Sequence, residues 1–291
     1  MGHVFTVIAP GAMGSAVARR LAEHGAEVRT TLAGRSASSR ARAAAAGMRP
    51  VEDETELVDG VDAVLAILPP GEARGLAQRL APLLAAARRK PLYLDCNAVS
   101  PATMAAISAL LASTGATILD GGIIGGPPRP GAEGPHIYVS GEAAPSARLL
   151  REYGLDIRIL DGPLGAASAL KMSYAGLTKG LTAIGAAMFL GAAASGADAA
   201  LVAELAESQP EMLAMLRHNL PPMYAKAYRW VAEMREIAAF LGPDVAGAQI
   251  YEGAARLYDQ LAAAHAAPAA DGAIARLDGV LAQARRRPDR P

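Results

Sequence analysis

The sequence has little of what marks a metalloprotein, a secreted disulfide protein or a nucleic-acid binder. Its one cysteine, Cys96, cannot form an internal disulfide or a site with several thiolate ligands. The five histidines are scattered and show no metal-ligand spacing. The 28 basic and 28 acidic residues give a formal net charge of zero, so no global field attracts a polyanion. We therefore expect a cytoplasmic protein with no metal site and no nucleic-acid partner.

Long apolar runs are also missing. In the C-terminal half the longest, residues 181–194, falls short of the about 20 residues that cross a bilayer. The N-terminus shows none of the features of a signal peptide, and we expect no membrane partner. The 291 residues are 52% hydrophobic and 19% charged, which argues against disorder and suits one large domain or two of moderate size.

The N-terminal half alternates between apolar strands and helices. Residues 4–8 form a short β-branched run, residues 15–24 read as a helix, and residues 27–32 read as a second strand. A β-α-β unit of this kind requires a parallel sheet. Further strands are predicted over 63–68, 91–95, 117–120, 137–140 and 157–160, with helices over 72–87 and 102–113. The sequence therefore predicts an α/β fold with an N-terminal doubly wound Rossmann sheet.

The pattern changes beyond Pro163. Residues 166–195 contain no proline and carry apolar side chains on nearly all faces, which predicts one buried helix of about 45 Å. The rest is also helical in pattern, with breaks expected at Pro210, Pro221-Pro222, Gly242-Pro243 and Pro268. We expect an NADP-binding Rossmann domain over 1–163 and an all-α substrate and dimerisation domain over 164–291. The tail from about residue 285 is expected to be disordered.

A glycine turn joins the first strand to the first helix. The run Ala9-Pro10-Gly11-Ala12-Met13-Gly14 stands where a dinucleotide fold has G-x-G-x-x-G, with alanine in place of the first glycine. Gly11 would let the backbone approach a pyrophosphate, and Gly14 would allow close helix-strand packing. The helix N-terminus would then face the phosphates, and a plain β-α turn is the alternative.

The residues after the second strand bear on the choice of nucleotide. Arg35 and Ser36 stand there, with Arg40 and Arg42 nearby and no Asp or Glu. An NAD site usually places a carboxylate on the ribose 2′-hydroxyl, whereas a 2′-phosphate requires arginine and hydroxyl donors. We therefore predict NADP as the cofactor, and ordinary solvated arginines are the alternative.

Five stretches occur in order along the chain. They are the glycine turn, Leu65-Ala66-Ile67-Leu68-Pro69, Asp95-Cys96-Asn97-Ala98-Val99-Ser100-Pro101, Asp120-Gly121-Gly122-Ile123-Ile124-Gly125-Gly126 and Lys171. Together they resemble the β-hydroxyacid dehydrogenase and 6-phosphogluconate dehydrogenase superfamily. The resemblance implies a Rossmann domain, an all-α domain and a homodimer formed through the latter. It also implies that Leu68, Pro69 and Asn97 lie near the nicotinamide and that Lys171 is catalytic.

The sequence departs from the family pattern at the substrate positions. Ile124 stands in place of a serine of the substrate loop, and Ala175 in place of an asparagine that follows the lysine. The resemblance implies that these groups hold the small hydroxyacid in related enzymes, so a larger or less anionic substrate is indicated here. The imine reductases are similar in architecture and generally replace the lysine. The resemblance is greatest to a branch of undefined substrate.

Hydride transfer belongs to the nicotinamide, so the protein must orient the substrate and handle one proton. A partly desolvated ammonium at Lys171 could serve as general acid or base. Tyr174 is three residues away on the same helical face and is a second candidate for general acid or base, whereas Lys179 is turned about 80° away. A lysine that reaches solvent is the alternative interpretation of Lys171.

Two loops could contact the substrate. Ser100 follows a parallel strand, where ligands bind in open α/β sheets, although it could equally cap the next helix. Ile124, Gly125 and Gly126 would line the substrate with backbone amides, although loop glycines often serve only as turn formers. Ala175 would line it from the helix.

The function predicted is an NADP-dependent oxidoreductase. It would transfer a hydride between NADPH and a small carbonyl or hydroxy substrate, or an imine, at the domain interface. The alternatives are an imine reductase and a non-catalytic protein that senses NADPH. The apolar helix 166–195 carries Gly176, Gly180, Gly185 and Gly191, which could permit close approach of a partner, so a homodimer is expected.

Overall fold

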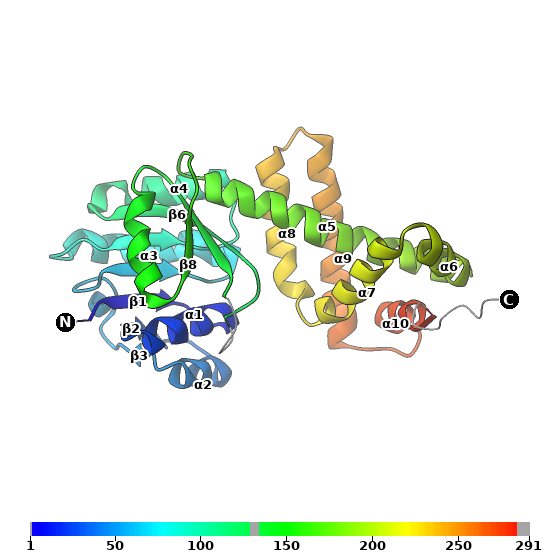
Figure 1. Cartoon of the computed structure of the whole chain (residues 1–291), viewed down its shortest axis with the longest axis horizontal. Helices are drawn as coiled ribbons and strands as arrows, with labels where there is room; N and C mark the ends of the chain where they lie inside the picture. Colours follow the sequence, from blue (N-terminus) through cyan, green and yellow to red (C-terminus); the bar gives the residue numbers. More distant parts are fainter. Residues whose placement is uncertain (1, 129–133, 284–291) are drawn as a thin grey trace. The chain divides into compact units, whose positions relative to one another are not determined.

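The structure, a computed structural model, describes residues 2–128 and 134–283. The chain divides into two compact units, residues 1–172 and 173–291. The first unit holds the sheet and its flanking helices, and the second is helical (Figure 1). This arrangement confirms the predicted fold class of a Rossmann sheet followed by an all-α part. The tail predicted to be disordered from residue 285 lies outside the described residues.

The described residues form one eight-stranded sheet in the order β3-β2-β1-β4-β5-β6-β7-β8. The strands are β1 (Val4–Ile8), β2 (Glu27–Thr30), β3 (Arg49–Pro50), β4 (Ala63–Ala66), β5 (Leu92–Asp95), β6 (Thr117–Ile124), β7 (His136–Ser140) and β8 (Asp156–Ile159). All neighbours are parallel except β6 and β7. The direction of sheet growth reverses between β1 and β4. In open α/β sheets, ligands bind outside the carboxyl ends of the strands at such a reversal.

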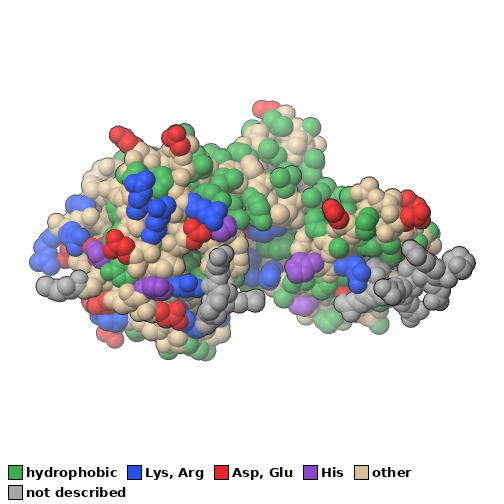
Figure 2. Space-filling model, viewed as in Figure 1, with side chains coloured by type: hydrophobic (Ala, Val, Ile, Leu, Met, Phe, Trp, Pro, Cys, Tyr) green, Lys and Arg blue, Asp and Glu red, His purple; other side chains and the backbone are tan. Residues whose placement is uncertain are grey.

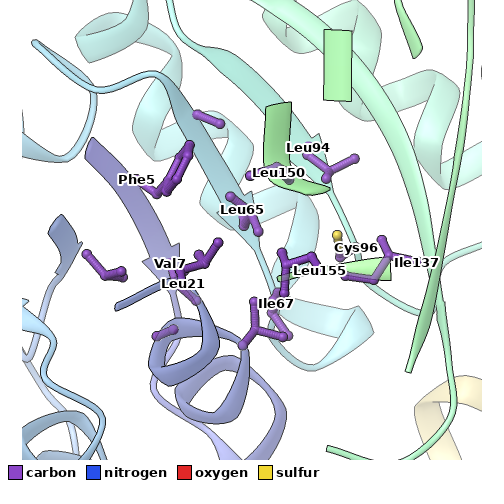
Figure 3. Close-up of a cluster of buried hydrophobic side chains, with 14 of the residues drawn as sticks. Phe5, Val7, Leu21, Leu65, Ile67, Leu94, Cys96, Ile137, Leu150 and Leu155 are labelled. Atoms are coloured by element: carbon purple, nitrogen blue, oxygen red, sulfur yellow. The ribbon is translucent and has the colours of Figure 1, made fainter. Parts of the chain in front are cut away.

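Helices and short 3₁₀ segments cover both faces of the sheet. The helices of this unit are α1 (Ala12–Glu23), α2 (Ala37–Ala45), α3 (Ala73–Ala86) and α4 (Pro101–Leu111). One core contains Val7, Leu21 and Leu65, which point toward one another in Figure 3. The other contains Ile8 and Val64, with side chains of α3 and α4. Successive residues of β1 and β4 therefore enter opposite cores, which explains why these strands are apolar throughout.

The second unit consists of helices joined by short turns. Its helices are α6 (Asp198–Ser208), α7 (Pro210–Tyr224), α8 (Ala227–Leu241), α9 (Ala246–Ala266) and α10 (Ala273–Gln283). Breaks occur at Pro210, Gly242-Pro243 and Pro268 as predicted, but the break predicted at Pro221-Pro222 is wrong because both prolines lie inside α7. They stand in its last turn and withdraw hydrogen bonds only from the carbonyls of Arg217 and His218, two residues exposed to water.

The helix α5 (Ala166–Ala194) begins in the first unit and continues into the second. It is long and apolar enough to cross a membrane, by length and composition alone, and 33% of its most apolar window is buried. Its exposed large side chains recur every three or four residues. We call these side chains the α5 stripe: Tyr174, Leu177, Leu181, Ile184 and Met188. This chain by itself therefore buries α5 only in part, and the expectation that a partner covers the rest stays a prediction.

The glycines of α5 also differ from the expectation. A Cβ at Gly180 would lie 3.2 Å from the ring of Tyr251 on α9, and a Cβ at Gly185 would lie 2.2 Å from a methyl group of Leu216 on α7. These two glycines therefore admit neighbouring helices of the same chain rather than a partner. Gly191 has nothing within 4 Å of its Cβ position.

Candidate functional site

The glycine turn leads from β1 into α1. Gly11 stands at the N-cap position in an extended conformation, and a Cβ placed there would meet nothing within 4 Å. A Cβ at Gly14 would lie 2.0 Å from the carbonyl oxygen of Ala9, so only glycine lets the helix pack this closely on the strand. No acidic side chain stands in the first turn of α1. The amides of Ala12 and Met13 therefore begin a helix whose positive end is open to an anion.

A group of arginines surrounds the start of α2. Ser36 caps this helix through a hydrogen bond from the Ser39 amide at 3.3 Å. The Arg42 guanidinium donates to the carbonyl of Pro10 at 3.1 Å, which joins α2 to the glycine turn. The Arg40 guanidinium donates to the carbonyl of Leu32 at 2.8 Å.

These arginines keep their charge unopposed. Among the described residues, neither Arg40 nor Arg42 forms an ion pair, and the side chain of Arg35 has no hydrogen-bond partner. No helix was predicted directly after the second strand, whereas Arg40 and Arg42 lie on α2. The short run Ala37–Ala45 buries only Ala43, so it has no apolar stripe by which the sequence could have revealed it. The cluster of cations fits a phosphate group.

The loops that follow β4 and β5 meet at Asn97. Its Oδ1 accepts a hydrogen bond from the Leu68 amide at 2.7 Å, beside Pro69. Asn97 is 2% exposed, and within the described part of the chain its Nδ2 has no hydrogen-bond partner. A buried donor left without an acceptor costs about 1–3 kcal/mol. An acceptor on a bound ligand, such as a carboxamide oxygen, would satisfy it.

Asp95 ends β5, two residues before Asn97, and is almost completely buried. Burial raises the pKa of its carboxyl to about 7, with hydrogen bonds from Asn97 working in the opposite direction. The charge of Asp120, its partner in the β5–β6 register, raises the pKa further. Burial likewise raises the pKa of the Cys96 thiol, so this cysteine is a buried apolar group rather than a nucleophile.

A buried carboxylate fastens the first turn of α5 to the sheet. Asp120 of β6 is fully buried, and its Oδ2 accepts hydrogen bonds from the Gly165 and Ser168 amides, both at 3.0 Å. Ser168 Oγ donates to the other oxygen at 2.6 Å. Ser140 of β7 donates to Asp120 at 2.9 Å and accepts from the Ala167 amide at 2.9 Å. A negative charge at a helix N-terminus stabilises the helix.

Lys171 lies one turn beyond this anchor. A Cβ at Gly122 of β6 would lie 2.8 Å from the carbonyl oxygen of Ala167 and 3.2 Å from the Cβ of Lys171. Gly122 therefore provides room for the helix and allows α5 to rest directly on β6, which places the half-buried Lys171 beside this strand.

The loop that the sequence predicts to contact the substrate begins where β6 ends. Ile124 is the last residue of that strand, and Gly125 follows with φ of +124°, a conformation that favours glycine. Gly126 is exposed, and a Cβ there would meet nothing within 4 Å. Ser100 is 1% exposed and caps α4 by accepting from the Thr103 amide at 3.2 Å, which is the alternative that the sequence allowed.

The remaining predicted residues lie in the second unit. Tyr174 is 48% exposed, as part of the α5 stripe, and Ala175 is buried. Lys179, the alternative proton carrier, forms an ion pair with Glu233 and stands over the ring of Trp230, 5.0 Å from the ring centroid. Lys179 is therefore held in an ion pair within the second unit, whereas Lys171 stands beside β6 in the first.

Comparisons with known proteins bear on both units. The NAD binding domain of 6-phosphogluconate dehydrogenase matches residues 5–151. A domain of unknown function, DUF1932, matches residues 192–261. An uncharacterised 28.5 kDa protein of Methanothermus fervidus is 30% identical over 158 residues, which are 54% of this chain. The matched stretch spans only 59% of that relative.

Solved structures share the fold over nearly the whole chain. The conserved protein MTH1747, of unknown function and described as similar to 3-hydroxyacid dehydrogenases, is 27% identical with a TM-score of 0.66 over 91% of this chain and 98% of its own. Mycobacterium tuberculosis 3-hydroxyisobutyrate dehydrogenase is 22% identical with a TM-score of 0.64, covering 98% and 100%. A Streptomyces aurantiacus imine reductase is 19% identical with a TM-score of 0.54, covering 95% and 99%.

Proposed function

The chain belongs to the family that carries the NAD binding domain of 6-phosphogluconate dehydrogenase, and from this premise we propose that it is an NADP-dependent oxidoreductase. It would transfer a hydride between NADPH and a carbonyl or hydroxy compound. The observation that carries the proposal is the open N-terminus of α1 behind Gly11, with the unopposed arginines of α2 joined to the same turn. A phosphate-bearing nucleotide fits both features.

Three groups of residues would hold NADP. Gly11, Ala12 and Met13 would bind the pyrophosphate through backbone amides. Arg35 and Ser36, with the neighbouring arginines, would bind the 2′-phosphate. Leu68 and Pro69 would lie against the nicotinamide, and the partnerless Nδ2 of Asn97 would donate to it. The bound nicotinamide supplies the hydride.

The protein's own contribution to the reaction is a positioned proton. Lys171 would give a proton to the substrate oxygen during reduction and take it back during oxidation. Asp120 keeps the first turn of α5 against β6, so the backbone that carries Lys171 is held in place. Tyr174 would serve as a second general acid or base.

The substrate would be held largely by backbone. Ile124 and Ala175 offer no polar side-chain atom, so the backbone amides of Gly125 and Gly126 would bind the substrate. The buried Ser100 caps α4 and would support this site indirectly. Substrates larger than a simple 3-hydroxyacid, or without its carboxylate at this place, fit such a loop. The lysine that imine reductases generally lack favours a carbonyl substrate over an imine.

A turnover assay separates this proposal from a sensor that only binds NADPH. NADPH oxidation would be followed with panels of aldehydes, ketones and imines, for the wild type and for Lys171→Ala. We expect turnover with a carbonyl compound, a loss of about 10²–10⁴-fold in kcat in the variant, and unchanged affinity for NADPH. Tight NADPH binding without turnover on any panel would indicate the sensor instead.

We also propose that the protein is a cytoplasmic homodimer in which a second copy covers the α5 stripe. The stripe exposes 45–66% of five large apolar side chains, and hydrophobic side chains cover much of α5 on the face shown in Figure 2. Monomeric proteins rarely leave such a contiguous patch uncovered. Light scattering after size-exclusion chromatography should give a dimer, and Leu181→Glu should give monomers.

A further inference from the structure

A cavity of about 250 Å³ lies within the helical unit. Residues of α5, α7 and the start of α8 line it, and it is somewhat smaller than the about 300–1,000 Å³ pockets that hold drug-sized molecules. Its polar lining includes Lys179, His218, Asn219 and Lys226, and its apolar lining includes Trp230. The cavity therefore combines cationic groups and hydrogen-bond donors with an aromatic wall.

The charges of this cavity do not balance. The Lys179 ammonium is neutralised by Glu233, which is 6% exposed. Lys226 has no ion-pair partner among the described residues. The whole chain contains only four lysines, and two of them line this one cavity. A net positive charge beside an apolar wall suits the anionic end of a small organic molecule.

Part of the hydrogen-bonding capacity of the lining is also unused. In the described part of the chain, the side-chain amide of Asn219 and the ring of His218 have no hydrogen-bond partner. Lys179, in contrast, is held in place by Glu233 and by the ring of Trp230. Trp230 itself packs edge-on against Tyr258, with ring centroids 5.1 Å apart. The cavity thus combines the packed ring of Trp230 with side-chain donors of Asn219 and His218 that could bind a ligand.

We propose that this cavity binds a small organic oxyanion, a carboxylate or a phosphate monoester. Lys226 and the amide of Asn219 would bind the oxyanion, and the apolar part of the molecule would contact Trp230 and Met223. The inference concerns the helical unit by itself, and it stands whether or not the chain is an oxidoreductase.

The chain offers a direct probe of this cavity, because Trp230 is its only tryptophan. The full-length protein, without nucleotide, would be titrated with sodium phosphate and with sodium propionate, and its tryptophan emission recorded. Sodium chloride at the same ionic strength serves as the reference for general salt effects. We expect a saturable change with at least one oxyanion and only a linear drift with chloride. Calorimetric titration with the same salts provides a readout that does not depend on emission.

Variants locate the response. Lys226→Gln should weaken binding at least tenfold, and Lys226→Arg should retain most of it. Arg217→Gln is the matched control, because it removes one exposed cation from α7 without altering the lining. Tighter binding of phosphate would assign a phosphate ester, and tighter binding of propionate a carboxylate. The proposal is overturned if both anions behave like chloride in emission and calorimetry, or if Lys226→Gln binds them as the wild type does.

Discussion

Ser168 Oγ donates a 2.6 Å hydrogen bond to Asp120 Oδ1, and this contact joins the first turn of α5 to strand β6 across 48 residues of sequence. The same carboxylate accepts from two backbone amides of that turn. Lys171 follows on the same helix, three residues after Ser168. One buried carboxylate therefore holds in place the helical turn that precedes the proposed catalytic lysine.

Replacing that carboxylate tests its positioning role. Asp120→Asn keeps the shape but places an NH₂ donor or a neutral oxygen against amides that need a charged acceptor. We expect the free energy of unfolding to fall by about 1.5–3 kcal/mol, measured by urea denaturation. At a temperature where the variant is folded, kcat should fall while KM for NADPH stays unchanged. Asp156→Asn, which alters exposed contacts with Arg158 and His136, should change neither quantity measurably.

The close approach of α5 to β6 can be tested at Gly122. An added methyl group would lie 2.8 Å from the carbonyl oxygen of Ala167, so Gly122→Ala must push the helix outward. We expect a loss of about 1–3 kcal/mol in the free energy of unfolding. In the control, Gly75→Ala on the exposed side of α3, an added methyl meets nothing within 4 Å, so stability should rise slightly. Equal stability of the two variants would contradict the packing described.

The buried Asp95 predicts a specific dependence of stability on pH. Its pKa is raised to about 7 by burial, whereas an aspartate in the unfolded chain has a pKa of about 3.9. Between these values the folded state binds more protons than the unfolded state, so this group's stabilising contribution is full below about pH 4 and lost as pH rises through about 7. Asp95→Asn keeps the acceptor for the Asn97 amide and removes the titration. The free energy of unfolding of the variant should therefore fall less between pH 5 and pH 8 than that of the wild type.

The sequence predicted what depends on local pattern. Strand β1 begins and ends at the predicted residues, and the apolar runs of β4 and β5 indicated strands buried on both faces. The pattern could not reveal α2, whose only buried residue is Ala43. Nor could it show that Pro221 and Pro222 would be tolerated inside α7, because that depends on whether the residues one turn earlier are exposed to water.

The candidate site was predictable in its members but not in its contacts. The motifs named Asn97, Lys171 and the glycine turn, yet the hydrogen bond from Leu68 to Asn97 spans 29 residues and the Asp120 anchor spans more than 40. Such contacts depend on strand order and register. Pairing of β5 with β6 brings Asp95 opposite Asp120, and that pairing exists only in the folded sheet.

The side chain of Arg35 tests the choice of nucleotide. It is half-buried, and within the described residues it has no side-chain partner, so Arg35→Ala should leave stability nearly unchanged. We expect the variant to lose most of its preference for NADPH over NADH, measured as the ratio of the two Kd values. Arg74→Ala, which removes an exposed arginine of α3, should keep the ratio of the wild type. An unchanged ratio in Arg35→Ala would remove this residue from the 2′-phosphate site.

The measurement that tests the central claim most directly is a calorimetric titration of the wild-type protein with NADPH and with NADH. The open N-terminus of α1 and the arginines beside it predict that both nucleotides bind and that NADPH binds at least tenfold more tightly, a difference of about 1.4 kcal/mol. Equal affinities would contradict the assignment of NADP. If neither nucleotide binds, the glycine turn is only a connection between β1 and α1, and the proposed oxidoreductase function is wrong.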